Sequence, residues 1–237
     1  MIIQPCAKFF GNKSIFPDKR YMCLLLCIVI LFAIKSFVLA FFITPLWDVP
    51  DELGHYSYMQ DIADGKGIPV LGKAMISKNI IVSSTRNENS PEEKNYIAQH
   101  PPLYYILGAA ILFITRKVSN NSDLIFRFPR MLSVLSGAIA LFVFYLIFMA
   151  VSNNTVFSTA AVGGISFIPM YSHMSSGVSH DIFLTMVTAF AVFFWIKFLK
   201  NRKYLDALFM GFFLSLGAVT KVSTLVWFLP MLIGVVI

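Results

Sequence analysis

Acidic and histidine side chains gather directly after the first long apolar stretch of the chain, in the segment WDVPDELGH. Asp51 and His55 are four residues apart, so on a helix their side chains would share a face. An acid beside a histidine can abstract a proton, bind a metal ion or contact a phosphate group. A simpler explanation is a helix start, where Asp48 caps the helix and Pro50 fits its first turn. Asp51 and Glu52 would then interact with the helix dipole, so catalysis and capping both stay open.

Three later stretches carry polar residues that could complete such a site. His100 stands immediately before a pair of prolines, and Arg130 begins another long apolar stretch. His180 and Asp181 precede an apolar run, where an acid is favoured near a helix N-terminus. Lys221 interrupts apolar sequence and is either a turn residue that reaches the membrane surface or a cation for a phosphate.

The composition is that of a membrane protein. Hydrophobic residues make up 57% of the chain and charged residues 13%, and the mean hydropathy is +0.74. Soluble domains carry about 25% charged residues, so a polytopic membrane protein is the better class. Because no basic patch interleaves with aromatic residues, we expect no nucleic-acid partner behind the net charge of +7. Cys6, Cys23 and Cys27 lie in or before the first apolar run, where we expect packing residues and no disulfides.

Apolar runs of about 20 residues predict the spanning helices of an all-α fold. Residues 1–21 are expected to be a cytoplasmic N-terminal segment, followed by an uncleaved signal anchor. Lys35 lies in the middle of this first span and either reaches the surface or pairs inside the bundle. Gly163 and Gly164 would let another helix approach closely. We expect about six spans, at residues 22–44, 131–151, 156–171, 182–199, 205–219 and 224–237.

Residues 103–115 are too short to span, and their placement sets the topology. If they did span, the basic cluster at 197–203 would lie outside, against the tendency of lysine and arginine to stay in the cytoplasm. We therefore expect an interfacial helix here, with Tyr104 and Tyr105 as anchors at the membrane surface. Residues 45–130 then form one large outer loop, and the polar residues described above collect on its side of the membrane, where they could line a single cavity.

Taken in order, five stretches resemble the N-terminal module of the GT-C superfamily, integral-membrane glycosyltransferases that use polyprenyl-phosphate-linked sugar donors. They are PDELGHYSY, HPPLYYIL, RFPRMLSVLSGAIALFVFYLI, SHDIFLTMVTAFAVFF and TKVSTLVWFLP. The chain is most similar to the bacterial branch with aminoarabinose and mannosyl transferases. The resemblance implies a bacterial inner-membrane protein that moves a sugar from such a donor to a lipid or glycan acceptor on the outer face. The alternative is a non-catalytic polytopic protein, transporter-like or a scaffold, or an inactive fragment of such an enzyme.

The resemblance also implies roles for single residues. Asp51, with Glu52 beside it, matches the superfamily's acid after the first span, which acts on the acceptor as a base or organises the site, so these two are the expected catalytic residues. Asp181 matches a second acid in the next outer loop. Some relatives contact the lipid phosphate through a lysine before the proline pair, where this chain has Gln99 and His100. The expected substrate-binding residues are Asp48, His55, His100, Arg130, His180, Asp181 and Lys221.

Cofactors and further chains are the last expectations from the resemblance. No cofactor is certain, and a divalent metal ion stays open. Superfamily members usually continue through more helices and often end in a soluble outer domain, whereas this chain stops inside the apolar run MLIGVVI. We therefore expect residues 22–237 to be a C-terminally truncated transmembrane module, with a second chain as a partner that completes the enzyme.

Overall fold

Helices make up the regular structure of the chain. The computed structural model describes residues 19–236, so Cys6 and most of the predicted cytoplasmic segment 1–21 lie outside the described residues. Within residues 19–236 the named elements are all helices, and an isolated bridge joins Met75 to Lys94. The predicted all-α membrane fold is confirmed.

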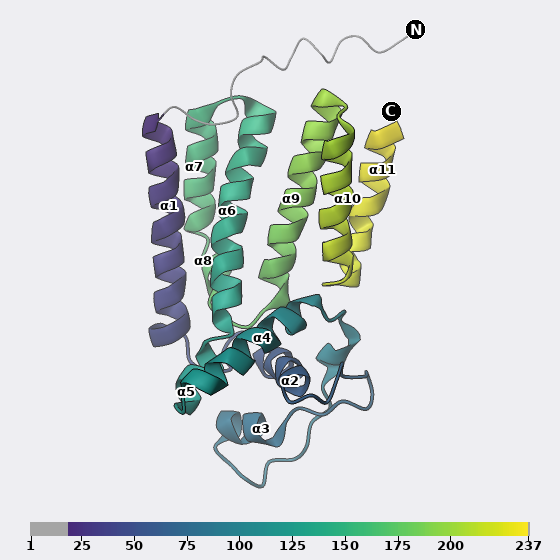
Figure 1. Cartoon of the computed structure of the whole chain (residues 1–237). Helices are drawn as coiled ribbons and strands as arrows, with labels where there is room; N and C mark the ends of the chain where they lie inside the picture. Colours follow the sequence, from purple (N-terminus) through teal and green to yellow (C-terminus); the bar gives the residue numbers. More distant parts are fainter. Residues whose placement is uncertain (1–18, 237) are drawn as a thin grey trace.

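Upright helices form a bundle that makes up most of the molecule (Figure 1). The helix α6 lies at its centre and contacts α1, α7 and α9, while α10 packs on α9. The bundle consists of α1 (Lys19–Val38) with a π-helical turn (Leu39–Ile43), α6 (Arg130–Ser152), α7 (Thr155–Ser166), α8 (Pro169–Ser175), α9 (His180–Asn201), α10 (Tyr204–Ala218), a 3-10 helix (Val222–Trp227) and α11 (Phe228–Val236).

The helices that could cross a membrane correspond to the six predicted spans. Those long and apolar enough by themselves are Lys19–Ile43, Ser122–Ser152 and His180–Asn201. Shorter apolar helices cover Thr155–Ser166, Tyr204–Ala218 and Val222–Gly234. The span predicted at 156–171 is broken in two, because α8 begins at Pro169, which has no N–H to continue α7.

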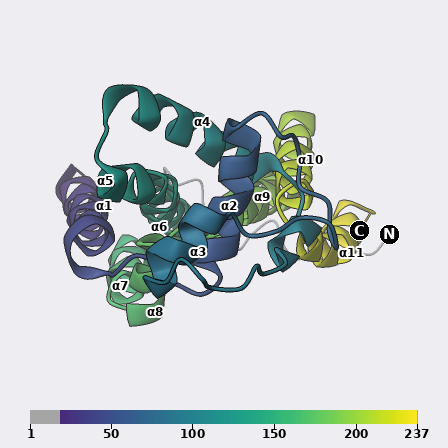
Figure 2. The ribbon, with the colours of Figure 1, turned by 90° about the horizontal axis from the view of Figure 1, so that it is seen from below.

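The long segment between α1 and α6 packs against one end of the bundle (Figure 1 and Figure 2). It contains α2 (Glu52–Ala63), α3 (Lys78–Thr85), a 3-10 helix (Tyr96–Gln99), α4 (Leu103–Val118) and α5 (Ser122–Arg127). The helix α4 lies across the end of the bundle and packs on α2, so residues 103–115 lie outside the bundle, as predicted. Tyr105 is fully buried against Tyr58 of α2, and Tyr104 is fully buried against Ser133 of α6 and Phe183 of α9. The prediction that the two tyrosines are surface anchors is therefore wrong.

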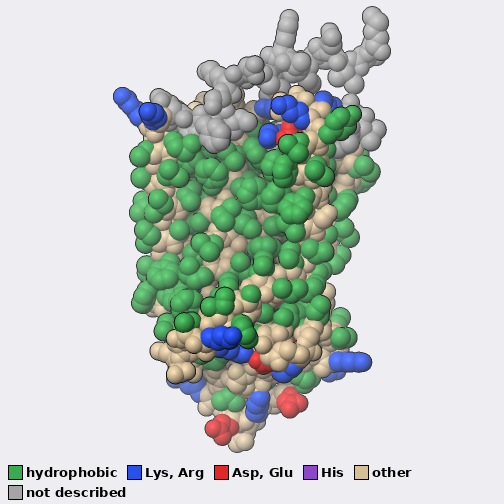
Figure 3. Space-filling view, in the orientation of Figure 1, with side chains coloured by type: hydrophobic (Ala, Val, Ile, Leu, Met, Phe, Trp, Pro, Cys, Tyr) green, Lys and Arg blue, Asp and Glu red, His purple; other side chains and the backbone are tan. Residues whose placement is uncertain are grey.

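On the face in view, charged side chains gather at the two ends of the molecule, and apolar side chains cover the flank between them (Figure 3). The end of α9, with the basic cluster 197–203, lies at the same end of the bundle as the start of α1, opposite the 45–130 loop (Figure 1). This is the relative placement that the charge argument predicted. Cys23 and Cys27 are exposed on α1, so the prediction that they are packing residues is wrong.

Lys35 pairs inside the bundle, which decides between its two predicted placements. Its Nζ donates to the carbonyl of Ser166 at 2.5 Å. It also lies 5.0 Å from the ring centroid of Phe32 and 5.9 Å from that of Phe167. Ser166 ends α7, where backbone carbonyls lack partners within the helix, so the break between α7 and α8 supplies the acceptor.

Helices approach one another closely at glycines other than the predicted pair, Gly163 and Gly164. A Cβ on Gly164 would meet nothing within 4 Å, and one on Gly163 would make an ordinary contact at 3.8 Å. The predicted role of this glycine pair is therefore wrong. Gly137 of α6 is one tight position, because a Cβ there would overlap the side chain of Ser175 in α8, and Gly108 of α4 is another, against Met59 of α2.

Candidate functional site

Asp51 stands at the start of α2, but its carboxylate does not cap the helix. The residue has a left-handed backbone conformation with a φ of 62° and makes no capping hydrogen bond. Its exposed carboxylate instead accepts a hydrogen bond from the hydroxyl of Tyr96. Asp48 is exposed before the helix begins, so the prediction that it is the cap is wrong. The predicted face shared by Asp51 and His55 is also wrong, because His55 is buried while Asp51 is exposed.

Glu52 and Arg130 form an ion pair in the interior. Their side chains are 1% and 0% exposed, with Nη2 2.7 Å from Oε2 and Nε 2.8 Å from Oε1. Glu52 also accepts from the backbone N–H groups of Trp47 and Val178, each at 2.9 Å. Arg130 also donates to the backbone carbonyls of Ala40, Thr44 and Pro45.

This pair has no position left for a substrate. Every N–H of the Arg130 guanidinium has an acceptor, and each carboxylate oxygen of Glu52 has two donors. The geometry therefore does not fit the predicted catalytic role of Glu52 or the predicted substrate-binding role of Arg130. It fits a structural role, because the pair ties the end of the first span to α2, α6 and the segment before α9.

Three histidine rings from three separate segments lie against one another in tilted contacts, and we call this group the histidine stack. The ring centroid of His180, at the start of α9, lies 4.7 Å from that of His55 in α2 and 4.4 Å from that of His100. Tyr105 of α4 extends the group, with its hydroxyl 3.0 Å from Nδ1 of His55. Tyr105 in turn stacks on Tyr58 at 3.9 Å, so the aromatic side chains of α2 and α4 hold the histidines from one side.

Asp181 and Lys221 form an ion pair beside the histidine stack. Nζ of Lys221 lies 2.7 Å from Oδ1 of Asp181, and the two side chains are 28% and 48% exposed. The same oxygen is 3.5 Å from Nε2 of His180, whose ring nitrogens are buried and make no hydrogen bond to any described residue. Ser179 caps α9 by accepting from the backbone N–H of Asp181, so the carboxylate of Asp181 is not needed as a cap.

The histidines, Asp181 and Lys221 thus converge from α2, the segment before α4, the start of α9 and the turn after α10. Asp51 lies near the same group, because its charge partly offsets the effects of burial and of Lys221, which together lower the pKa of His100. The sequence predicted that these residues converge. The further prediction, that they line one cavity, stays a prediction. Sequence reasoning missed Tyr96, which lies 45 residues after its partner Asp51, a separation that no local spacing rule covers.

Burial of the histidines makes stability sensitive to acid. Burial is the main cause that lowers the pKa of His55 well below 6.5, and it also lowers the pKa of His100. The charge of Lys221 lowers the pKa of both rings further. Above a pH of about 6.5 these rings are neutral in both the folded and the unfolded chain, so their contribution is constant. Below it the unfolded chain takes up protons that the folded chain does not, so we predict that the free energy of unfolding falls.

Thermal unfolding in detergent from about pH 8 to about pH 5 measures this loss. A variant with His55→Asn and His100→Asn should lose less stability over the same range, because two of the groups that take up protons are gone. If the parent and the double variant show equal slopes, the histidines do not cause the acid sensitivity.

Metal binding has no ligand set in the described part of the chain. Among residues 19–236, no three histidine, cysteine or acidic side chains are arranged to hold a metal ion. The divalent metal that the resemblance left open stays a prediction.

Comparison with known proteins gives a family for this arrangement. No curated protein and no solved structure matches the chain. The family model described as dolichyl-phosphate-mannose-protein mannosyltransferase matches residues 99–237, which is more than half of the chain and includes His100, Asp181 and Lys221. The chain therefore belongs to the dolichyl-phosphate-mannose-protein mannosyltransferase family, whose members are GT-C glycosyltransferases.

Proposed function

We propose that the protein transfers a sugar from a polyprenyl-phosphate-linked donor to an acceptor hydroxyl at the end of the bundle that carries the 45–130 loop. The observation that carries this proposal is that an exposed acid, Asp51, and a lysine, Lys221, converge at the same end of the apolar bundle. A lipid-linked donor needs that combination, because its prenyl chain stays in the bilayer while its phosphate and sugar reach the surface. Membership of the family supports the same reaction class.

In the proposed reaction the acceptor oxygen attacks the anomeric carbon of the donor sugar. The bond between that carbon and the phosphate oxygen breaks, and the polyprenyl phosphate leaves with the electron pair. Asp51 takes the proton from the acceptor hydroxyl, because its carboxylate is exposed and Tyr96 holds it by a hydrogen bond. The products are the glycosylated acceptor and polyprenyl phosphate.

Lys221 is the proposed cation for the donor phosphate. It is partly exposed, and its pairing with Asp181 fixes the ammonium group next to the histidine stack. The lowered pKa of His100 argues against a histidine cation in this role, since the ring is neutral near neutral pH. His55, His100 and His180 then shape the site as neutral rings, which can donate or accept hydrogen bonds.

The membrane orientation is part of the proposal. Lysines and arginines of the 197–203 cluster lie at the end opposite the 45–130 loop, the same end as the start of α1. Because such residues tend to stay in the cytoplasm, we propose that the N-terminus lies inside and the candidate site on the outer face. The resemblance to the bacterial branch supports a bacterial inner membrane.

Replacing Lys221 with methionine tests the donor site. We predict that the KM for the polyprenyl-phosphate sugar rises about 10–100-fold, because the phosphate loses a charge-assisted hydrogen bond. Lys221→Arg should retain most of the donor affinity. The measurement is the initial rate of label transfer from a labelled donor as the donor concentration varies, with Lys203→Met at the opposite end as the control. A KM for Lys221→Met equal to that of the control would remove Lys221 from the donor site.

A further inference from the structure

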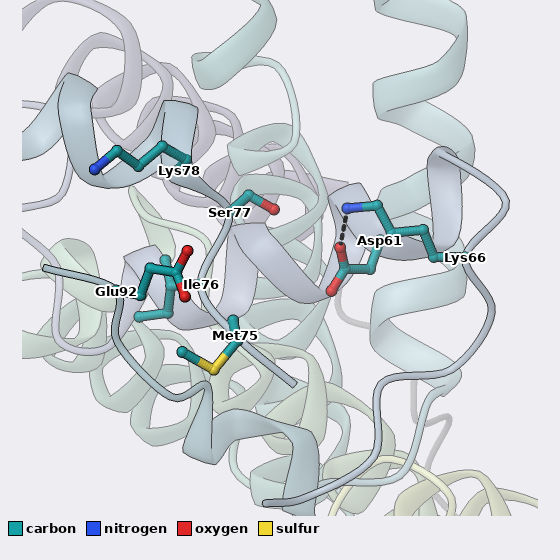
Figure 4. A pocket seen from close by; sticks show the side chains of 7 residues that line it. All are labelled: Asp61, Lys66, Met75, Ile76, Ser77, Lys78 and Glu92. Atoms are coloured by element: carbon teal, nitrogen blue, oxygen red, sulfur yellow. Dashed lines mark hydrogen bonds and ion pairs between the residues drawn. The ribbon is translucent and has the colours of Figure 1, made fainter. Parts of the chain in front are cut away.

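A second site lies on the loop, in a pocket of about 310 Å³ that none of the stacked histidines lines. Figure 4 shows its side chains, which come from the end of α2, the turn after it, the segment that enters α3, and Glu92. We call it the α2–α3 pocket. Its volume is at the lower end of the range for small-molecule sites, about 300–1,000 Å³, which fits a ligand of one or two rings.

The wall of the α2–α3 pocket is held by hydrogen bonds. The backbone N–H of Ser77 donates to Oγ of Ser57 in α2 at 2.9 Å. The N–H of Ile76 donates to the carbonyl of Glu93 at 2.8 Å, next to the bridge between Met75 and Lys94. The pocket is therefore formed before a ligand arrives, which reduces the entropy lost on binding.

The charges that line the pocket balance one another. Asp61 and Glu92 supply two carboxylates, and Lys66 and Lys78 supply two ammonium groups. Lys66 lies 2.8 Å from Oδ1 of Asp61, and Lys78 donates to the carbonyl of Ser90 at 2.8 Å. An anionic ligand would meet the two carboxylates, and a cationic ligand would meet the two lysines. The lining therefore favours a neutral ligand that both donates and accepts hydrogen bonds.

A sugar ring has these properties. Its hydroxyls can donate to the carboxylates of Asp61 and Glu92 and bond to the hydroxyl of Ser77. Its C–H face needs apolar surface, which Met75 and Ile76 provide. We infer that the α2–α3 pocket binds a neutral sugar unit of the acceptor, which makes the acceptor a glycan. That this sugar belongs to the acceptor rests on the proposed function, whereas the binding of a sugar here rests on the pocket alone.

The position of the pocket along α2 agrees with an extended acceptor. Asp51, at the start of α2, and Asp61, in the pocket, are ten residues apart, or about 15 Å along the helix axis. A glycan of several units that is held in the pocket by one unit can therefore place another unit at Asp51. A small monohydric acceptor would not reach both places.

Binding of neutral trisaccharides to the full chain in detergent micelles tests this inference. The probes are trisaccharides of mannose, of galactose and of N-acetylglucosamine, with binding measured by ligand-observed NMR. We expect one of these to bind, and we expect Asp61→Asn with Glu92→Gln to weaken binding at least about tenfold. Glu93→Gln is the matched control, because Glu93 is the exposed neighbour of Glu92 and its side chain does not line the pocket.

The outcomes separate this inference from the proposed function. If no trisaccharide binds the parent, or if the double variant binds as tightly as Glu93→Gln, the sugar site is refuted whatever the transfer activity. If trisaccharides bind as expected but no donor sugar is transferred, the site stands and the proposed function fails.

Discussion

Replacing Asp51 with asparagine should slow sugar transfer about 10²–10⁴-fold while the protein stays folded. The substitution removes the carboxylate that takes the acceptor proton and keeps nearly the same volume. The substitution should lower the free energy of unfolding by only about a few tenths of a kcal/mol, because Asp51 is exposed and makes no capping bond. Asparagine also tolerates the left-handed conformation at this position. Single-turnover transfer at saturating donor measures the rate, with thermal unfolding measured on the same sample.

Two further variants make this result specific. Tyr96→Phe keeps the carboxylate and removes only the hydroxyl that holds it, so it should reduce the rate by far less than Asp51→Asn. Asp123→Asn removes another exposed acid, on α5, and should leave the rate unchanged. Transfer by Asp51→Asn at the parental rate would mean that Asp51 is not the base.

Replacing Arg130 with methionine should destabilise the protein by about 3–5 kcal/mol. The change leaves the buried carboxylate of Glu52 without its partner and the carbonyl of Pro45 without the Arg130 donor. The carbonyls of Ala40 and Thr44 lose one of their two arginine donors and keep Arg127. A buried charge without a partner is costly because the interior cannot replace its hydration. The measurement is the yield of folded protein and the midpoint of thermal unfolding in detergent.

Arg116→Met is the matched control for Arg130. Arg116 also forms an ion pair, with Asp64 at 2.6 Å, but the two side chains are 32% and 31% exposed. A pair of this kind contributes about 0–1 kcal/mol, so the control should unfold close to the parent. Equal unfolding midpoints for the two variants would show that the buried pair does not hold the loop to the bundle.

The bundle could be predicted from the sequence because its signal is local. Apolar runs fix where a chain can cross a membrane, and the predicted spans 131–151 and 182–199 differ from α6 and α9 by one or two residues at each end. The length of residues 103–115 likewise placed α4 outside the bundle. The break between α7 and α8 was also visible in the sequence as Pro169, but the apolar run alone conceals it.

The site was predictable as a set of residues and unpredictable in its contacts. Glu52 and Arg130 are separated by 78 residues, and no spacing rule distinguishes a structural acid from the proposed catalytic acid beside it. Asp51 itself has a left-handed backbone conformation, which the helical spacing between Asp51 and His55 does not predict. Tyr105 has a polar tip and an apolar body, which suits a membrane surface and a core equally, so only the packing of α4 on α2 decides its place.

The central claim is that the protein moves sugar from a polyprenyl phosphate at the site of Asp51 and Lys221. The most direct test is a single comparison in proteoliposomes loaded with a polyprenyl-phosphate-linked labelled sugar and a glycan acceptor. We expect the parent to transfer label to the acceptor and to release an equal amount of polyprenyl phosphate. We expect Asp51→Asn to remain folded and to carry out both steps far more slowly than the parent. Equal transfer by the parent and by Asp51→Asn, or no transfer by the folded parent from any polyprenyl-phosphate sugar, would contradict the claim.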